Sequence, residues 1–336
     1  MDAELEIKDS ETEKNEMISV NLTILPLINE DSEGRTDKKD DFLGILLMIE
    51  DISSEKRMKS TMSRYMDPGI ADQLLEDGAD IMGGLDTTAT LLFSDLRSFT
   101  NITESLGAQG TVKLLNEYFE IMVECISEQG GMLDKFIGDA IMAAFGLPIS
   151  HEDDEDRGVK AGINMISRLW KWNEFREKDG KPPLDMGLGL NTDKIVAGNI
   201  GSQKRMDYTM IGDGVNLAAR LESACKQYNA RILISDFTFK KLKGTYRIRN
   251  IDDVVVKGKT EPIGVYEVLD YHNDETFPNL MDVVNHFNEG RKKYKSGDFK
   301  NAIDSFNECL KGNKNDILSK TYIERCNQLL IDNPKD

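Results

Sequence analysis

Apolar residues recur through the middle of the chain in short runs that predict strands and at three- to four-residue spacings that predict helices. The expected order is a strand over 89–93, a helix with apolar positions from Val112 to Ile126, strands over 132–137 and 140–145, a helix opened by the acidic run 152–156, a hairpin of 186–190 and 195–200, and a strand over 208–211 that leads into a third helix. This is the ferredoxin-like βαββαβ order, which predicts an α+β fold with helices over one face of a sheet.

The N-terminal part has a different pattern. Residues 18–27 and 42–49 are strand-like and are joined by the polar stretch 29–41. Two strands make no core, so we expect them to pair with a partner chain or to belong to a domain of which the sequence holds only the end. The run Leu-Gly-Ile-Leu-Leu-Met-Ile-Glu-Asp-Ile-Ser (43–53) resembles the last strand of a PAS-type sensor and the exit to its output helix.

A charged segment follows from Ser53 to about Tyr65, with apolar residues at Met58, Met62 and Tyr65. This narrow seam suits a parallel two-helix linker, and a single helix lying on the next domain is the alternative. Asp67-Pro68-Gly69 then breaks the helix.

The composition changes again after Asp270. Phe287, Gly290, Tyr294, Gly297, Ala302 and Phe306 resemble one tetratricopeptide-type helix pair, and 317–330 reads as a further helix. A single repeat cannot form a solenoid, so we expect it to pack on the main domain or on a second chain. The sequence therefore predicts four parts, namely the end of a sensor domain (1–52), a signalling linker (53–85), a catalytic domain (86–270) and a helical extension (271–336).

Composition narrows the possible partners. The 42 basic and 60 acidic side chains give a net charge of −18, which repels nucleic acid and anionic lipid overall. The four cysteines show no paired metal-type spacing, which favours a reduced, cytoplasmic protein. The longest apolar run, 42–49, is too short to cross a bilayer.

Two acidic residues stand where catalysis could be built. Asp95 follows the apolar strand 89–93, and Asp139 occupies the expected hairpin tip next to Gly138. Most Asp residues at hairpin tips only satisfy turn backbone, so neither position is informative alone. Together, two carboxylates at neighbouring strand ends can hold two hard cations about 4 Å apart for in-line phosphoryl chemistry.

Four motifs in order carry a resemblance. They are Phe-Ser-Asp-Leu-Arg-Ser-Phe-Thr (93–100), Asp-Lys-Phe-Ile-Gly-Asp-Ala (134–140), Tyr-Thr-Met-Ile-Gly-Asp-Gly-Val-Asn-Leu-Ala-Ala-Arg-Leu-Glu (208–222) and Val-Lys-Gly-Lys (256–259). In their order and spacing they resemble the catalytic domain of class III nucleotide cyclases, closest to bacterial adenylate cyclases similar to the bicarbonate-responsive soluble enzymes. The resemblance implies conversion of ATP to 3′,5′-cyclic AMP and pyrophosphate in a head-to-tail homodimer, with active sites at the interface.

The resemblance also assigns roles at the reacting end of the nucleotide. Asp95 and Asp139, with the carbonyl of Leu96, would hold two Mg²⁺ or Mn²⁺ ions. Asn216 would orient the ribose, and Arg220 would contact the phosphate as charge builds in the transition state. Asn216 and Arg220 stand at i and i+4, so they share one face of a helix. The alternative to a catalytic role is that both are ordinary surface residues.

Further residues would bind the phosphates. Lys257 is expected to bind the terminal phosphates. Lys259 lies two residues further on, so the sequence does not decide which of the two lysines has this role, and Arg205 is a weaker candidate. Backbone N–H groups at the start of the first helix, from Phe99 and Thr100 to Ile102, could hold phosphate oxygens as well.

Lys135 and Thr209 fall where the family reads the purine. Lysine can donate to adenine N1 and threonine can accept from the 6-amino group, whereas guanine offers the reverse pattern. The sequence thus favours ATP over GTP, although each residue alone would read as an ordinary surface lysine or strand threonine. Thr192-Asp193-Lys194, Ser98 and Ala219 depart from the usual family residues at turn and packing positions.

Two alternatives stay open. A guanylate cyclase of the same fold would differ only in its base-reading residues. A non-catalytic nucleotide-binding dimerisation module would pass a signal from the upstream sensor without turnover, but Asp95, Asp139, Asn216 and Arg220 are all present, which argues against it.

Overall fold

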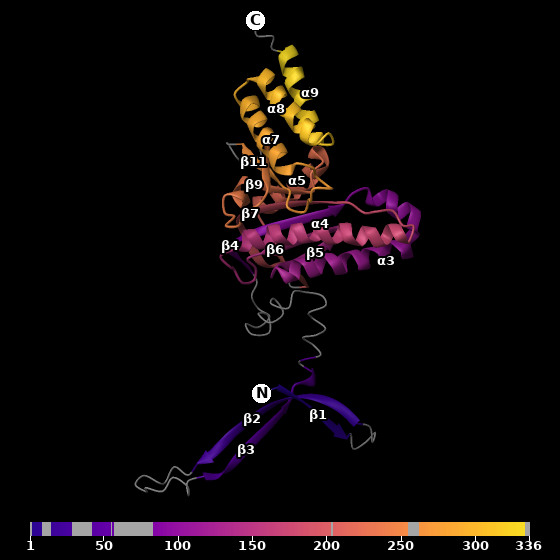
Figure 1. Cartoon of the computed structure of the whole chain (residues 1–336). Coiled ribbons are helices and arrows are strands. Elements are labelled where there is room, and N and C mark those ends of the chain that lie inside the picture. The colour runs from indigo at the N-terminus through magenta and orange to yellow at the C-terminus, as the bar shows by residue number, and fades with distance from the viewer. Residues whose placement is uncertain are drawn as a thin grey trace, which may run out of the picture. The chain divides into compact units, whose positions relative to one another are not determined.

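The computed structural model describes residues 2–8, 15–28, 42–54, 56, 83–202, 204–254 and 262–332. The chain divides into two compact units, Met1–Ala79 and Asp80–Asp336 (Figure 1). No helix among these residues combines the length and the apolar composition needed to span a membrane.

The first unit is an antiparallel sheet of three strands in the order β1-β2-β3. These are β1 (Asp2–Lys8), β2 (Asn15–Ile28) and β3 (Phe42–Asp51). The pattern predicted β2 and β3 but missed β1, whose alternating acidic and apolar residues pair with the first half of β2. Of the expected linker helix, Met58, Met62 and Tyr65 lie outside the described residues.

The second unit opens with the predicted order of elements. They are β4 (Gly83–Leu96), α3 (Phe99–Glu128), β5 (Met132–Ile137), β6 (Ala140–Phe145), α4 (Asp154–Lys178) and β7 (Met186–Ser202). The chain continues through β8 (Arg205–Ile211), α5 (Asp213–Tyr228), β9 (Ile232–Ser235), α6 (Asp236–Phe239), β10 (Ile248–Val254) and β11 (Ile263–Val268). The sheet order is β10-β11-β9-β7-β4-β6-β5, with β8 pairing β7, which confirms the mixed α+β fold.

One predicted hairpin is wrong. Residues 186–190 and 195–200 belong to the single strand β7, which pairs with β4 from Gly83 to Leu96 without a turn at Thr192-Asp193-Lys194. The polar residue Thr192 is buried in this strand because its hydroxyl hydrogen-bonds those of Thr90 and Thr238, at 2.8 and 3.1 Å. Satisfied in this way, a polar residue can lie inside a central strand.

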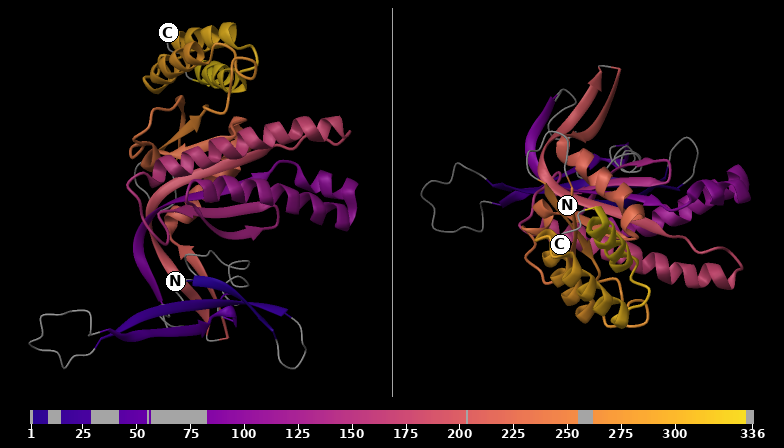
Figure 2. Two further views of the ribbon diagram at one scale, coloured as in Figure 1. Left: turned by 60° about the horizontal axis from the view of Figure 1, so that its bottom comes forward. Right: turned by 90° about the horizontal axis from the view of Figure 1, so that it is seen from above.

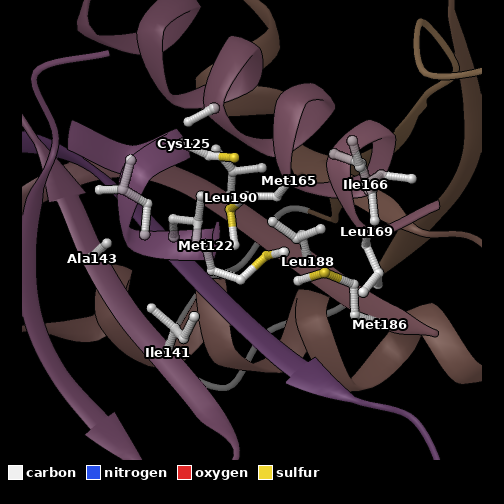
Figure 3. Packing of buried hydrophobic residues seen from close by; sticks show 14 of the residues in the cluster. Met122, Cys125, Ile141, Ala143, Met165, Ile166, Leu169, Met186, Leu188 and Leu190 are labelled. Atoms are coloured by element: carbon white, nitrogen blue, oxygen red, sulfur yellow. The ribbon is translucent and has the colours of Figure 1, made fainter. Parts of the chain in front are cut away.

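Helices cover both faces of the sheet, not one. On one face, α3 and α4 lie side by side over β4, β6 and β7 (Figures 1 and 2). Their core includes Met122 and Cys125 of α3, Met165, Ile166 and Leu169 of α4, and Leu188 and Leu190 of β7 (Figure 3). Burying each such side chain stabilises the fold by about 1.5–3 kcal/mol.

On the other face, α5 packs directly against β7 at Gly187 and Gly189. A Cβ at Gly189 would lie 2.2 Å from the backbone nitrogen of Glu222 and 2.3 Å from the carbonyl oxygen of Ala218. Only glycine allows the helix backbone to approach the strand this closely. The placement of α5, on which two predicted site residues stand, therefore depends on this contact.

The chain ends in three helices, α7 (Leu280–Lys295), α8 (Phe299–Gly312) and α9 (Ile317–Asp332). Phe287, Phe306 and Tyr322 of these helices share one buried cluster with Leu221 of α5 and Val265 of β11. The helices thus pack on the sheet of the second unit, at the end where α5 and β11 lie (Figure 1).

A buried ion cluster joins these helices to the sheet. The Arg249 guanidinium of β10 donates to Glu267 at 2.7 Å and to Asp316 at 2.9 Å, and all three side chains are at most 4% exposed. Two buried carboxylates thus depend on one cation.

Arg249→Met should lower the free energy of unfolding by about 3–5 kcal/mol, because it leaves two buried carboxylates without a cation. Burial already raises the pKa of Glu267, and the Arg249 guanidinium opposes that shift. Without the guanidinium the pKa of Glu267 rises further, so the loss should be larger at pH 8 than at pH 5. Denaturant titrations at both pH values measure this. The control is Arg168→Met, which removes an exposed arginine that also pairs with two carboxylates, Glu124 and Glu128, and should cost under about 1 kcal/mol. Equal losses in the two variants would contradict the prediction.

Candidate active site

The structure brings Asp95 and Asp139 together at one end of the sheet. Asp95 is the last residue but one of β4, and Asp139 lies in the two-residue turn between β5 and β6. The pairing of Ser94 with Ile141, continued by two residues, places Asp139 beside Leu96. Gly138 has a φ of 68°, the conformation that a glycine at the first position of such a turn adopts readily. The register and the turn therefore fix both carboxylates.

The two carboxyl groups interact directly. Burial and the neighbouring Asp95 carboxylate raise the pKa of Asp139 to about 6, while the backbone N–H groups of Asp139 and Leu96 oppose the shift. The only cation near them among the described ion pairs is Lys226 of α5, whose ammonium lies 3.7 Å from Asp95. The two carboxylates are thus held close together, and a single lysine offsets their repulsion.

This donor set fits a hard divalent cation. Two carboxylates and the Leu96 carbonyl are oxygen ligands, which Mg²⁺ and Mn²⁺ prefer. Within the described ranges no group of three or more His, Cys, Asp or Glu side chains forms a closed metal site. Mg²⁺ sites of the phosphoryl-transfer kind commonly use one or two carboxylates and leave the other positions to water and substrate phosphates.

Lys135 and Thr209 lie next to each other through a third residue, Asp134. The Thr209 hydroxyl on β8 donates to the Asp134 carboxylate on β5 at 3.2 Å, and the Lys135 ammonium lies 3.7 Å from the same oxygen. Residues 75 positions apart in sequence are therefore in contact. The two residues that sequence reasoning assigned to the purine do form one cluster.

Asn216 and Arg220 stand exposed on α5 and are not brought to the acidic pair of the same chain. Lys226, the α5 residue that reaches Asp95, is about 9 Å further along the helix than Arg220 and points about 120° away from it. The Arg220 side chain has no hydrogen-bond or ion-pair partner in the described part of the chain. Both side chains face outward, where a second molecule could meet them.

The expected phosphate-binding residues are only partly described. Phe99 and Thr100 begin α3, where the first N–H groups of a helix have no acceptor within it. Arg205 is 84% exposed at the start of β8 and lies 3.7 Å from Asp207. Lys257 and Lys259 lie outside the described residues.

Sequence reasoning missed three polar neighbours of the site. Asp134 directly precedes Lys135, but nothing in the apolar pattern indicated that it would be buried. Lys226 belongs to the helix of Asn216 and Arg220, yet it turns toward Asp95. Glu222, one turn earlier, has its pKa raised by burial and by the Asp95 carboxylate.

Comparison with known proteins matches the sequence of this chain to one family. The sequence profile described as "Adenylate and Guanylate cyclase catalytic domain" matches residues 85–269. The chain is 37% identical over 246 residues to "Adenylate cyclase, terminal-differentiation specific" of Dictyostelium discoideum, covering 71% of this chain and 11% of that protein. It is 39% identical over 186 residues to an adenylate cyclase of Anabaena cylindrica, covering 53% of this chain and 36% of that protein. The chain thus spans well under half the length of these curated relatives.

Solved structures give the same fold. The guanylyl cyclase Cya2 matches with a TM-score of 0.51 and 39% identity over 56% of this chain and 94% of that one. The adenylyl cyclase CyaB from P. aeruginosa matches with a TM-score of 0.52 and 36% identity over 57% of this chain and 99% of that one. Both base specificities occur at similar identity, so overall likeness does not separate them.

Asp139→Asn should stabilise the metal-free protein, because it removes one of two repelling charges. The gain should be on the order of 1 kcal/mol for these partly exposed groups. Since the folded-state pKa of Asp139 is raised to about 6, the penalty in the parent chain exists above that pH and vanishes toward pH 4, so the difference should be largest at neutral pH.

Thermal melting in a chelator at pH 7.5 and pH 4.5 measures the effect. Adding Mn²⁺ should raise the melting temperature of the parent protein and leave that of Asp139→Asn nearly unchanged. A variant less stable than its parent at pH 7.5, or stabilised equally by Mn²⁺, would show that the pair is not a metal site.

Proposed function

The chain belongs to the family of adenylate and guanylate cyclase catalytic domains, and from that premise we propose that it converts ATP to 3′,5′-cyclic AMP and pyrophosphate. The observation that carries this proposal is that one chain holds two polar clusters. Lys135 and Thr209 both contact Asp134, and Asp95 and Asp139 contact each other. One cluster suits the purine and the other suits the triphosphate.

The purine cluster favours adenine. The Lys135 ammonium has only donors, which suits the unprotonated N1 of adenine. The Thr209 hydroxyl keeps its lone pairs free to accept from the 6-amino group, since its proton goes to Asp134. Guanine presents a protonated N1 and a 6-oxo group, so both contacts would fail with it.

The acidic pair would act on the phosphates. Asp95, Asp139 and the Leu96 carbonyl would hold two Mg²⁺ or Mn²⁺ ions against the triphosphate. When bound, such ions lower the pKa of the ribose 3′-hydroxyl and neutralise charge on the departing pyrophosphate. The protein's own part is to hold both carboxylates at neighbouring strand ends, and to add phosphate donors from Phe99, Thr100 and Lys257, with Arg205 as the weaker candidate.

A second copy of the chain would complete the site. Asn216 and Arg220 face outward, away from the acidic pair of their own chain, so we propose that they serve the acidic pair of a partner in a head-to-tail homodimer. There Asn216 would orient the ribose, and the planar Arg220 guanidinium would bind the phosphate as its charge increases.

We further propose that residues 86–270 are an output domain that a sensor regulates. In this proposal residues 1–52 end a PAS-like domain, 53–85 link it to the cyclase, and 271–336 are a helical extension. All four cysteines are buried and unpaired, which supports a reducing compartment such as the cytoplasm.

The reaction can be tested with the full chain, Mn²⁺ or Mg²⁺, and labelled ATP or GTP. We expect cyclic AMP from ATP, with kcat/KM for GTP lower by at least about 100-fold, as expected where a site hydrogen-bonds the groups that distinguish the bases. Asp95→Ala and Asp139→Ala serve as controls that should form neither product. Cyclic GMP formed as fast as cyclic AMP would favour the guanylate cyclase alternative, and ATP binding without pyrophosphate release would favour the non-catalytic module.

The shared site can be tested by mixing two inactive variants. Arg220→Lys keeps the charge but loses the guanidinium fork, so kcat should fall far more than KM changes. Asp139→Asn should be inactive through loss of metal binding. An equal mixture should regain roughly a quarter of the parent activity, because half of the dimers would be mixed and each of these would have one intact site. No recovery after subunit exchange would contradict the two-chain site.

A further inference from the structure

Asp134 lies in a β-bulge directly before Lys135. In the β5–β6 pair, Leu133 lies opposite Ala143 and Lys135 lies opposite Met142, so Asp134 is an extra residue without a partner position. Successive side chains of a regular strand point to opposite faces, but a bulge redirects one of them. This explains why the side chains of Asp134 and Lys135 meet at 3.7 Å.

The bulge turns a carboxylate inward. The Asp134 side chain is only 1% exposed, whereas that of Lys135 is 38% exposed. Its Oδ2 atom takes both the Thr209 hydroxyl and the Lys135 ammonium, and its Oδ1 atom is buried with no hydrogen-bond partner among the described residues. A buried carboxylate oxygen without a hydrogen-bond donor lowers the stability of the fold. A residue kept at this cost is therefore a candidate for a functional role.

The chemistry of the contact fixes the direction of the Thr209 hydroxyl. An ionised carboxylate can only accept hydrogen bonds, so in this contact the hydroxyl must be the donor. Its lone pairs are then the only polar feature that it can offer to a ligand. A hydroxyl held in this way accepts from an amino group and cannot donate to an oxo group.

We propose that Asp134 is a positioning residue for purine selection, which holds the Thr209 hydroxyl as an obligate acceptor and steers the Lys135 ammonium beside it. This inference rests on the proposed adenylate cyclase function and adds a residue to its base recognition. Asp134 itself does not touch the nucleotide. It makes Thr209 reject 6-oxo purines, whereas a freely rotating hydroxyl would accept either substituent.

Three nucleotides test the proposal in the full chain, namely ATP, inosine triphosphate with its 6-oxo group, and purine riboside triphosphate with no 6-substituent. In Asp134→Asn, an amide of the same shape can either donate to or accept from the hydroxyl, so Thr209 regains both roles. We expect kcat/KM for ATP to fall about tenfold, the size of one hydrogen bond, and that for inosine triphosphate to rise. The value for purine riboside triphosphate should change less than about threefold, because this base lacks the group that Thr209 reads.

A double-mutant cycle tests whether Asp134 acts through Thr209. In a Thr209→Val background, adding Asp134→Asn should leave the ratio of ATP to purine riboside triphosphate unchanged. Asp86→Asn, which removes the same charge from an exposed position on β4, should change none of the three values. Thermal melting shows whether each variant folds, and Asp134→Ser supplies the same comparison if Asp134→Asn does not.

The outcomes separate this inference from the proposed function. A parent protein that forms no cyclic AMP, or prefers the 6-oxo nucleotide, overturns the proposed function. A parent that prefers ATP while Asp134→Asn lowers all three values equally, or changes none, overturns the role of Asp134 alone. An ATP-specific loss that persists in the Thr209→Val background would also overturn it, because Asp134 would then act without Thr209.

Discussion

Asp95 and Asp139 repel each other, and the pairing of β4 with β6 is what keeps them in contact. Phe145, Ala143 and Ile141 of β6 belong to the core cluster under α3 and α4, whereas Met142 and Ala144 do not, so a slip of one residue would move all three out of that core. The same register sets Asp139 beside Leu96, whose backbone N–H favours the ionised form of Asp139. The apolar core therefore holds an electrostatically unfavourable pair that neither strand end would adopt alone, and the placement of the nucleotide depends on it.

The parts of the fold that local pattern determines could be predicted. A two-residue turn at Gly138-Asp139 between apolar runs is predicted by the local sequence, and helical spacing predicted that α3 and α4 are helices. The buried face of α3 was only partly predicted, because Val112 is exposed whereas Leu114 and Tyr118 are buried. The hairpin expected within β7 was wrong because Thr192-Asp193-Lys194 looks like a turn, while the hydroxyls of Thr90 and Thr238 that satisfy Thr192 come from distant elements. The bulge at Asp134 and the ion cluster of Arg249 were missed for the same reason, since both depend on contacts between distant segments.

Helix α5 has two separate faces at the site. Toward its C-terminus, Lys226 reaches Asp95 of its own chain, while Asn216 and Arg220 in the first half point away from that carboxylate. The close approach at Gly189 leaves the helix little freedom to rotate, so the two faces are not interchangeable. A helix fixed in this way cannot bring Arg220 to its own acidic pair, and this rigidity is the physical reason to look for a second chain.

In the proposed site, the β5–β6 hairpin would serve both ends of the nucleotide. Lys135 on β5 and Asp139 in the turn are four residues apart, which is roughly 13 Å along an extended strand and suits a ligand that extends from a purine to its phosphates. In the sheet order, β4 and β6 separate β5 from β7, the strand that pairs with β8, yet the Thr209 hydroxyl of β8 reaches Asp134 of β5. The bulge would act only at the proposed purine end, since the pairing is regular from Lys135 to the turn. Base selection could therefore change at residues 134, 135 and 209 without moving the carboxylates, which would let one fold serve either ATP or GTP.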